Sequence, residues 1–370
     1  MPFFRSNYGA SGGGDGGEDT WNESYLEIIS NNNFFTDYPL KLEVNTELFL
    51  LNNYGWDIES LKEFRVGNCV RYLSSVFSGY RSGSAFNGIV NLQGATSLYT
   101  AYSLMNNCAR FNSTVIFPDY IRAFDPLYPG GPTGFSGSEL SFYQFMNGCY
   151  NYNQPIHIKV REMSRPSNAS ITLSLGLFFN GCSNLNSKVT FEFDKYNKDP
   201  ESITNSYIGY SCHNMFNGCY KFNQPMIFPI GLTSGSNLFN YCSNFDQPVV
   251  FDTAYFGPYS YFGVSNCFYC APNMRSDIIF TNVNDSTQMW INKLIYSTNN
   301  SRSINIYSNN IEKITAVNDL IYGVSEITWS EVTNGVYNEM YNIYVLNNVS
   351  DGLNTFNNYY YNFYGELPIF

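Results

Sequence analysis

Cysteine and histidine are the residues of this chain that most readily suggest chemistry. The pair Cys267 and Cys270 has the spacing of a redox-active dithiol, and Cys212-His213 lies shortly before Cys219. Thiolates and imidazoles bind zinc, and a Cys-x-x-Cys pair can exchange disulfides. A structural explanation competes with both, because Cys219 and Cys267 also occupy positions of a repeat. We therefore expect no metal and no cofactor.

Acid–base chemistry has few candidates. His157 lies in an alternating stretch between two isoleucines, so its side chain should point outward as an ordinary surface residue. Glu192 and Asp252 fall at nearby outward positions without evident partners. The Gly-rich stretch 11–19 lacks the Gly-Lys-Ser/Thr of a phosphate-binding loop. We expect no catalytic residue and a protein that is not an enzyme, with a polysaccharide-degrading enzyme as a remote alternative.

A recurring segment accounts for most of the cysteines. Residues 215–228 read Met-Phe-Asn-Gly-Cys-Tyr-Lys-Phe-Asn-Gln-Pro-Met-Ile-Phe, and similar segments begin at 104, 145, 178 and 238, with a looser one at 266. Self-similarity of this kind predicts stacked repeats. The shared cysteine slot predicts a ladder of small, buried, reduced thiols rather than disulfides: Cys108, Cys149, Cys182, Cys219, Cys242 and Cys270. The slot four residues later should hydrogen-bond the backbone of adjacent repeats: Asn112, Asn153, Asn186 and Asn223.

Each repeat should contain one strand and one helical or turn-like segment. The third and fifth residues after the ladder asparagine are apolar in every copy, which is the period of a strand. Apolar positions before the cysteine suggest helical stretches at 69–77, 96–107 and 289–296. Asn-Gly before three of the cysteines suits a left-handed corner. We expect an α/β fold with a parallel sheet on one side and short helices or turns on the other.

The run Phe-x-Gly-Cys-x-x-(Phe/Leu)-Asn resembles the BspA-like leucine-rich-repeat family of bacterial and phage surface proteins, over about 64–281. The resemblance implies a right-handed leucine-rich-repeat-like solenoid with roles in adhesion and recognition. The chain departs from the family pattern in three ways. Its consensus leucines are often Phe, Tyr or Met, its repeat spacing is irregular, and it lacks the secretion signal of the bacterial adhesins.

Composition shifts divide the chain into four parts. We expect a flexible Gly-rich arm at 1–20, an N-terminal cap at 21–62, the repeat solenoid at 63–284, and degenerate coils with an aromatic C-terminal cap at 285–370. The arm either docks into a neighbouring subunit or is a disordered terminus. The aromatic tail 356–364 either caps the last coil or inserts into another subunit.

Two features predict an interaction surface. Insertions rich in Tyr, Ser and Gly resemble antibody-like binding loops, although their rings could instead pack back onto the repeats. The outward row on the strands contains aliphatic residues, which marks an interface unless insertions or another chain cover it. The candidate interface residues are Ile116, Ile227, Val250, Ile279, Tyr120, Tyr128, Phe135, Tyr255, Tyr259 and Tyr261.

Composition narrows the function. The net charge of −11 argues against nucleic acid, and the sequence contains no apolar run long enough for a membrane span. The first residues lack the apolar segment of a signal peptide. A recognition protein without an export signal could reach the outside by lysis. We therefore expect a structural or adhesive phage virion component, such as a head-decoration, fibre or tail-associated protein.

Its partners would then be other virion or surface proteins, or a cell-surface glycan or protein receptor. The alternative is an extracellular adhesin on the surface of a bacterial or protist cell.

Overall fold

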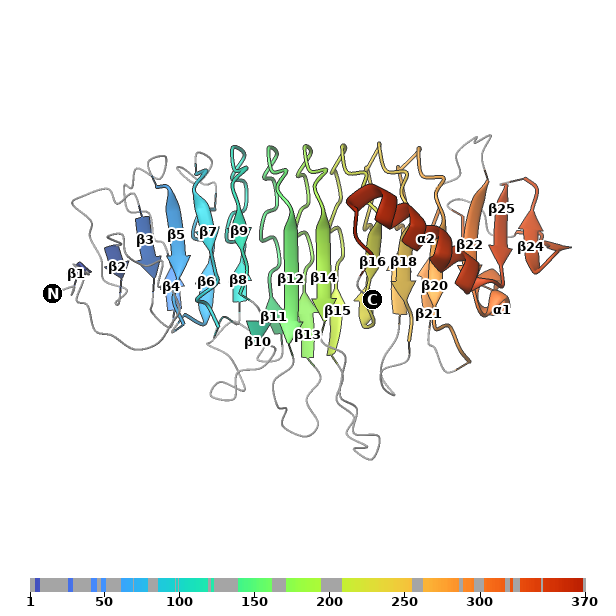
Figure 1. Ribbon diagram of the computed structural model, residues 1–370, viewed down its shortest axis with the longest axis horizontal. Coiled ribbons are helices and arrows are strands. Elements are labelled where there is room, and N and C mark those ends of the chain that lie inside the picture. Colours follow the sequence, from blue (N-terminus) through green and yellow to red (C-terminus); the bar gives the residue numbers. More distant parts are fainter. Residues whose placement is uncertain are drawn as a thin grey trace, which may run out of the picture.

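The fold is strand-rich, with parallel sheets and two helices in the described part of the chain (Figure 1). This confirms the expected α/β mixture with parallel strands, but the side on which short helices or turns were expected carries further parallel strands. The computed structural model describes residues 4–6, 26–28, 41–44, 48–50, 61–68, 70–78, 86–96, 98, 100–118, 121–122, 139–161, 171–193, 208–254, 262–285, 289–295, 303–316, 320–321, 327–340 and 342–368.

One set of strands, here called the front strands, lies side by side along the long axis of the molecule (Figure 1). They form three hydrogen-bonded runs, all parallel except at the two ends. The first run is β1 (Phe4–Ser6), β2 (Leu26–Ile28), β3 (Lys41–Val44), β5 (Glu63–Val66), β7 (Ile89–Asn91) and β9 (Val115–Ile116). The second is β10 (Ile121–Arg122), β12 (Ile156–Arg161) and β14 (Val189–Phe193). The third is β16 (Met226–Phe228), β18 (Val249–Asp252), β20 (Ile278–Thr281), β22 (Ile304–Ser308), β25 (Ile343–Leu346), β24 (Gly335–Asn338) and β23 (Ser330–Val332).

A second set of parallel strands, the rear strands, alternates with the first along the chain. One run is β4 (Leu48–Leu50), β6 (Tyr72–Ser74), β8 (Thr100–Tyr102), β11 (Glu139–Ser141), β13 (Ile171–Ser174), β15 (Ile208–Ser211) and β17 (Leu232–Ser234). The other is β19 (Phe262–Ser265) with β21 (Met289–Asn292). From β3 to β22 each repeat therefore supplies one rear strand and one front strand, except that β9 and β10 both lie between the rear strands β8 and β11.

Three stretches predicted to be helical contain rear strands, so that prediction is wrong. The stretches 69–77, 96–107 and 289–296 contain β6, β8 and β21 instead. Their helix-like spacing arises in the corners, where consecutive turns close with hydrogen bonds between residues three apart, such as Cys149 N–H to the Met146 carbonyl at 3.1 Å. Such turns bring apolar residues three positions apart onto one side, as a helix would.

The corner glycines behave as their sequence predicts. Gly148, Gly181 and Gly218, each directly before a ladder cysteine, all have φ of +73°. Only glycine adopts that conformation without steric cost. A coiled turn of the same shape is thus repeated at the top of the molecule in Figure 1.

The core consists of the inward residues of both strand sets and of the corners. The expected inward positions on the front strands are buried, for example Val249, Phe251, Ile278 and Phe280. Their rings stack from repeat to repeat, with Phe251 5.2 Å from Phe228 and 5.4 Å from Phe280 between ring centroids.

The C-terminal part leaves the repeat pattern. After β22 come a short helix α1 (Ile311–Thr315), the antiparallel strands β23 and β24, and β25. Helix α2 (Val349–Tyr364) then runs back across the outer face of β18, β20 and β22 (Figure 1). It starts at Asn348, whose side chain caps the Asp351 N–H, and ends at Gly365 in the left-handed conformation.

Candidate functional site

The ladder cysteines lie in the core. Five of the six are fully buried and Cys270 is half-buried. Cys149, Cys182 and Cys219 lie in successive repeats, and each thiol donates to a carbonyl of the preceding one, at 3.1, 3.1 and 3.0 Å. Burial raises the pKa of each of these thiols above its ordinary value. A thiol held neutral is a poor nucleophile and a poor metal ligand.

The ladder asparagines form a line of side-chain hydrogen bonds. The Asn112 N–H donates to Asn87 Oδ1 at 2.7 Å, and the same bond recurs at Asn153, Asn186 and Asn223 with lengths of 2.7 to 2.9 Å. The line continues through Asp246, whose carboxylate accepts from the Arg275 N–H at 2.8 Å. Each of these side chains supplies an acceptor to the next repeat.

The other candidate metal and redox residues are not gathered into a site. Cys212 is buried, whereas the neighbouring His213 ring makes its contact with Ser211 Oγ, 3.0 Å from Nδ1. Cys267 is fully buried and Cys270 is a free thiol. Within the described residues, no group of three His, Cys, Asp or Glu side chains could hold a metal ion.

Helix α2 covers part of the predicted outward row. Val250 and Ile279 are 1% and 0% exposed because Phe356 and Tyr360 of α2 pack on them. The prediction that these two residues form an exposed interface is therefore wrong, because the chain's own C-terminal helix covers them. Ile227 packs at the margin of the same cluster, and Ile116 is half-buried on the uncovered part.

The remaining predicted interface residues lie outside the described part of the chain: Tyr120, Tyr128, Phe135, Tyr255, Tyr259 and Tyr261.

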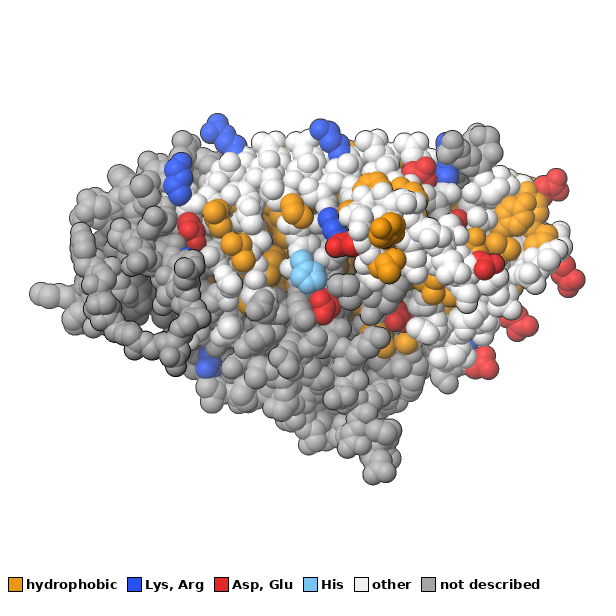
Figure 2. All heavy atoms as spheres, in the orientation of Figure 1, with side chains coloured by type: hydrophobic (Ala, Val, Ile, Leu, Met, Phe, Trp, Pro, Cys, Tyr) orange, Lys and Arg blue, Asp and Glu red, His pale blue; other side chains and the backbone are white. Residues whose placement is uncertain are grey.

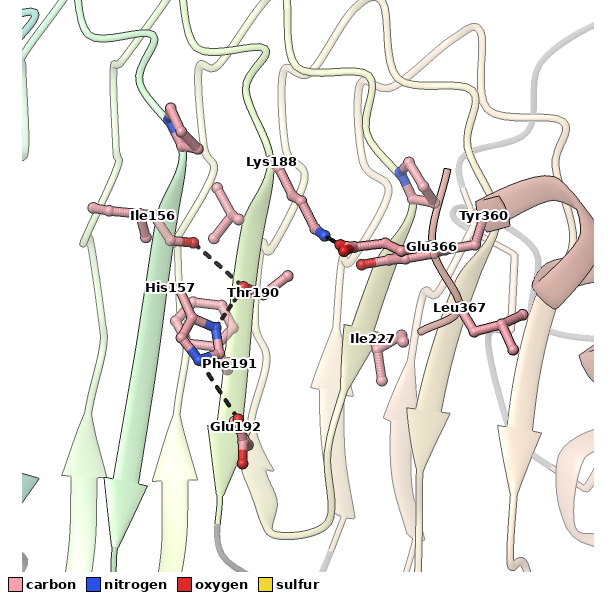
Figure 3. Close-up of a pocket in the computed structure, with 13 residues that line it drawn as sticks. Ile156, His157, Lys188, Thr190, Phe191, Glu192, Ile227, Tyr360, Glu366 and Leu367 are labelled. Carbon is pink, nitrogen blue, oxygen red and sulfur yellow. Dashed lines mark hydrogen bonds and ion pairs between the residues drawn. The ribbon is translucent and has the colours of Figure 1, made fainter. Parts of the chain in front are cut away.

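A groove of about 450 Å³ opens on the outer face beside α2, where the front strands pass from the β14 run to the β16 run (Figures 2 and 3). Figure 2 shows a histidine and an acidic side chain at the centre of this face. The groove is lined by Pro155, His157, Lys188, Thr190 and Glu192 on one side, and by Pro225, Ile227, Tyr360, Glu366 and Leu367 on the other.

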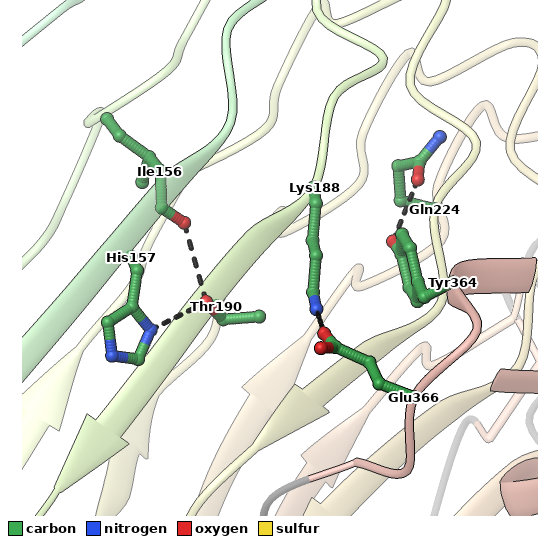
Figure 4. A network of polar contacts seen from close by, with 7 residues as sticks. All are labelled: Ile156, His157, Lys188, Thr190, Gln224, Tyr364 and Glu366. Carbon is green, nitrogen blue, oxygen red and sulfur yellow. Dashed lines mark hydrogen bonds and ion pairs between the residues drawn. The ribbon is translucent and has the colours of Figure 1, made fainter. Parts of the chain in front are cut away.

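Polar contacts at one end of the groove join α2 to the sheet (Figure 4). Lys188 Nζ pairs with the Glu366 carboxylate and lies 4.6 Å from the ring centroid of Tyr364. The Tyr364 hydroxyl donates to Gln224 Oε1 at 2.7 Å. Burial opposes the charge on Lys188, but hydrogen bonds with Glu366 and Tyr360 outweigh it and raise the pKa of the amine. Burial also raises the pKa of Tyr364.

A second contact set lies at the other end of the groove. His157 Nδ1 is 2.8 Å from Thr190 Oγ1, and His157 Nε2 is 3.5 Å from Glu192 Oε2 (Figures 3 and 4). His157 therefore points outward as expected. Glu192 and Asp252, expected without partners, each have one, since Asp252 accepts from Asn282 at 2.9 Å.

The groove can hold a ligand by polar and apolar contacts at once. Two pairs of its polar groups already contact each other, Lys188 with Glu366 and His157 with Glu192. The sequence did not point to Lys188 or Glu366. Tyr364 belongs to the aromatic tail 356–364, which was predicted to cap the last coil or to insert into another subunit.

No protein-family model, no curated protein and no solved structure matches this chain. No helix in the described part is long and apolar enough to cross a membrane.

Proposed function

We propose that this chain is a non-enzymatic structural or adhesive protein in which a right-handed leucine-rich-repeat-like solenoid is a rigid binding scaffold. We further propose that it is a component of a phage virion, such as a head decoration, a fibre or a tail-associated protein. The resemblance of the Asn-Gly-Cys segments to BspA-like repeats supports the class. A bacterial or protist surface adhesin is the alternative.

The observation that carries the proposal is the continuous ladder from Asn87 to Arg275. Each rung is a hydrogen bond of 2.7 to 2.9 Å between neighbouring repeats. Rings and thiols stack beside it in the same register. In a stacked array each repeat is stabilised by its neighbours, so such ladders stiffen the whole body. Stiffness over this length benefits a support or a binding surface.

The groove supports binding more than turnover. Its polar groups pair as Lys188 with Glu366 and His157 with Glu192. A hydrolase would need one carboxyl group kept protonated as an acid and a second positioned across the scissile bond. The paired state of both groove carboxylates favours a site that orients a ligand.

The location is tested by mass spectrometry and antibody labelling of purified particles and of intact cells. Particle association at stoichiometric levels supports the virion proposal, and capsid or tail genes beside this one would agree with it. Labelling of cell surfaces in the absence of particles would favour the adhesin.

The enzymatic alternative has its own test. Sugar release from polysaccharides that is lost in Glu192→Gln would overturn the non-enzymatic proposal.

A further inference from the structure

The residues directly after the first five ladder cysteines form a row along the corner edge, here called the corner row. It reads Ala109, Tyr150, Ser183, Tyr220 and Ser243 in successive repeats. Neighbouring repeats are joined along it by backbone hydrogen bonds: the carbonyls of the first four residues accept from the amides of Asn151, Asn184, Lys221 and Asn244 at 3.1 to 3.3 Å. The row is therefore fixed in position by the fold.

Tyrosine side chains on this edge are unusually exposed. Tyr150 and Tyr220 are 52% and 53% exposed, although the same slot holds the small residues alanine and serine in the other repeats. Neither ring is needed to fill the core at that slot. Rigid rings that leave half of their surface in water are typical of binding sites, because they add contact area with little loss of side-chain entropy.

A third tyrosine on the edge is held in a strained conformation. Tyr241 precedes Cys242 in the slot of Gly148, Gly181 and Gly218, and it has φ of +59° with 49% of its surface exposed. A bulky residue in this region is a steric outlier, and such strain is concentrated at functional sites. Glycine adopts this conformation at no steric cost in three other repeats, so the exposed ring of Tyr241 is present in spite of the backbone conformation.

We propose that the corner row, with Tyr241, binds an extended polysaccharide chain; this inference rests on the proposed adhesive function. Tyr150 and Tyr220 are two repeats apart, or about 10 Å at the spacing of paired strands. That distance matches two sugar units of an extended chain. Aromatic faces are electron-rich and attract the C–H faces of sugar rings. The exposed Asn151 and the half-buried Ser183 and Asn184 carry amide and hydroxyl groups for sugar hydroxyls, and Asn184 Nδ2 holds the Asn151 amide in place by donating to its Oδ1 at 3.2 Å.

Charge and shape favour a glycan over other polymers. The five segments of the row (109–112, 150–153, 183–186, 220–223 and 243–246) contain Arg110 and Lys221 against one acid, Asp246, in a chain of net charge −11. The edge can thus accept neutral or acidic sugars. Nucleic acid would need far more positive charge. A protein partner would need a contiguous apolar patch, whereas here serine separates the rings.

The experiment is affinity electrophoresis of the full chain in gels containing dextran, laminarin or xylan as neutral probes, and alginate or hyaluronan as acidic ones. We expect at least one polysaccharide to retard the protein. The double variant Tyr150→Ser/Tyr220→Ser should weaken binding about tenfold or more. It should still fold, because the chain itself places serine in this slot at Ser183 and Ser243.

Two further variants separate binding from stability. Tyr361→Ser removes a tyrosine of equal exposure (54%) from α2, away from the row, and should leave retardation unchanged. Tyr241→Gly should raise the unfolding midpoint by relieving strain while weakening retardation, an opposition that a structural role would not produce.

Retardation by none of the probes, or retardation that survives in the double variant, would overturn the site. The proposed function is judged separately, since association with particles or cells by a chain that no polysaccharide retards would leave it standing without this site.

Discussion

The two halves of the front sheet use the same repeat position in opposite ways. On β18 and β20 the outward residues Val250 and Ile279 are buried beneath α2, whereas on β12 the equivalent His157 faces solvent. The strands, the register and the ladders beside them are alike in both halves. The difference is made by a helix that arrives from the end of the chain. Val250 and Ile279 therefore mark where α2 docks, whereas the outward Ile116 lies on the part of the sheet that α2 does not cover.

The sharpest test places one substitution in both halves. Ile279→Asn removes a fully buried side chain and leaves an amide without a partner beneath α2, so we expect a loss of about 4 kcal/mol. Ile116→Asn makes the same change at the equivalent position of β9, where the side chain is half-buried. The neighbouring strand β7 already has Asn91 at this position, so the substitution should cost less than about 1 kcal/mol. Urea unfolding measures both, and equal losses would contradict the comparison.

The helix side of the contact gives the second test. Phe356 is 1% exposed against Val250 and Ile279, so Phe356→Ala should weaken docking of α2 by about 3 kcal/mol. Phe363→Ala on the exposed side of the same helix should change it by no more than about 0.5 kcal/mol. Amide hydrogen exchange across 349–364 reports the docking directly. If amide exchange across 349–364 becomes rapid only in the Phe363→Ala variant, the buried and exposed faces of α2 are the reverse of those assigned.

A glycine determines how closely α2 approaches the sheet. A Cβ at Gly352 would lie 2.7 Å from the Cγ of Tyr307 on β22. Alanine favours a helix by about 1 kcal/mol over glycine, but the clash should outweigh this, so Gly352→Ala should destabilise docking by about 1 kcal/mol. Asn354→Ala on the exposed side is the control and should be slightly stabilising. If adding Tyr307→Ala does not restore the docking of α2 in the Gly352→Ala variant, the contact with Tyr307 is not the cause of the loss.

Repetition made the interior predictable. Cys219 and Asn223 each have copies in register, so aligning the copies is enough to predict the two ladders. A position that stays small or apolar in every copy must face inward, which predicts the inward strand positions as well. The rear strands could not be separated from helices, because turn residues such as Met146 and Cys149 repeat with a spacing of three. Local periodicity is ambiguous for short apolar runs.

The groove could not be predicted from repetition at all. Lys188 and Gln224 belong to the repeats, but their partners Glu366 and Tyr364 come from a tail without copies. No pattern within a repeat encodes such a contact, because its partner lies at a long and unrepeated sequence distance. The outward aliphatic row was the only trace of α2 in the repeats, and it could not distinguish cover by the same chain from cover by another.

The smallest effect concerns two polar contacts between the C-terminal segment and the sheet, Lys188 with Glu366 and Tyr364 with Gln224, here called the polar clip. Lys188 has a raised pKa, so its contribution to docking is complete below its ordinary value of 10.5 and is lost as the pH rises through the folded-state value. Tyr364 has an ordinary pKa of 10.0 that burial raises, so the undocked tyrosine ionises first and docking weakens further above pH 10.0. Both groups act in the same direction. We expect near-ultraviolet circular dichroism of α2 to stay constant below this range and to fall above it.

Tyr364→Phe separates the two groups. It removes the hydroxyl that donates to Gln224, which should cost about 1 kcal/mol at neutral pH. It should also make the alkaline decline shallower, because one of the groups that titrate is gone while Lys188 and Tyr360 remain. Lys188→Met should cost less than about 1 kcal/mol at neutral pH, as expected for a partly exposed ion pair. A decline identical in wild type and in both variants would mean that ionisation elsewhere loosens the helix, and that the clip does not hold α2 on the covered half of the sheet.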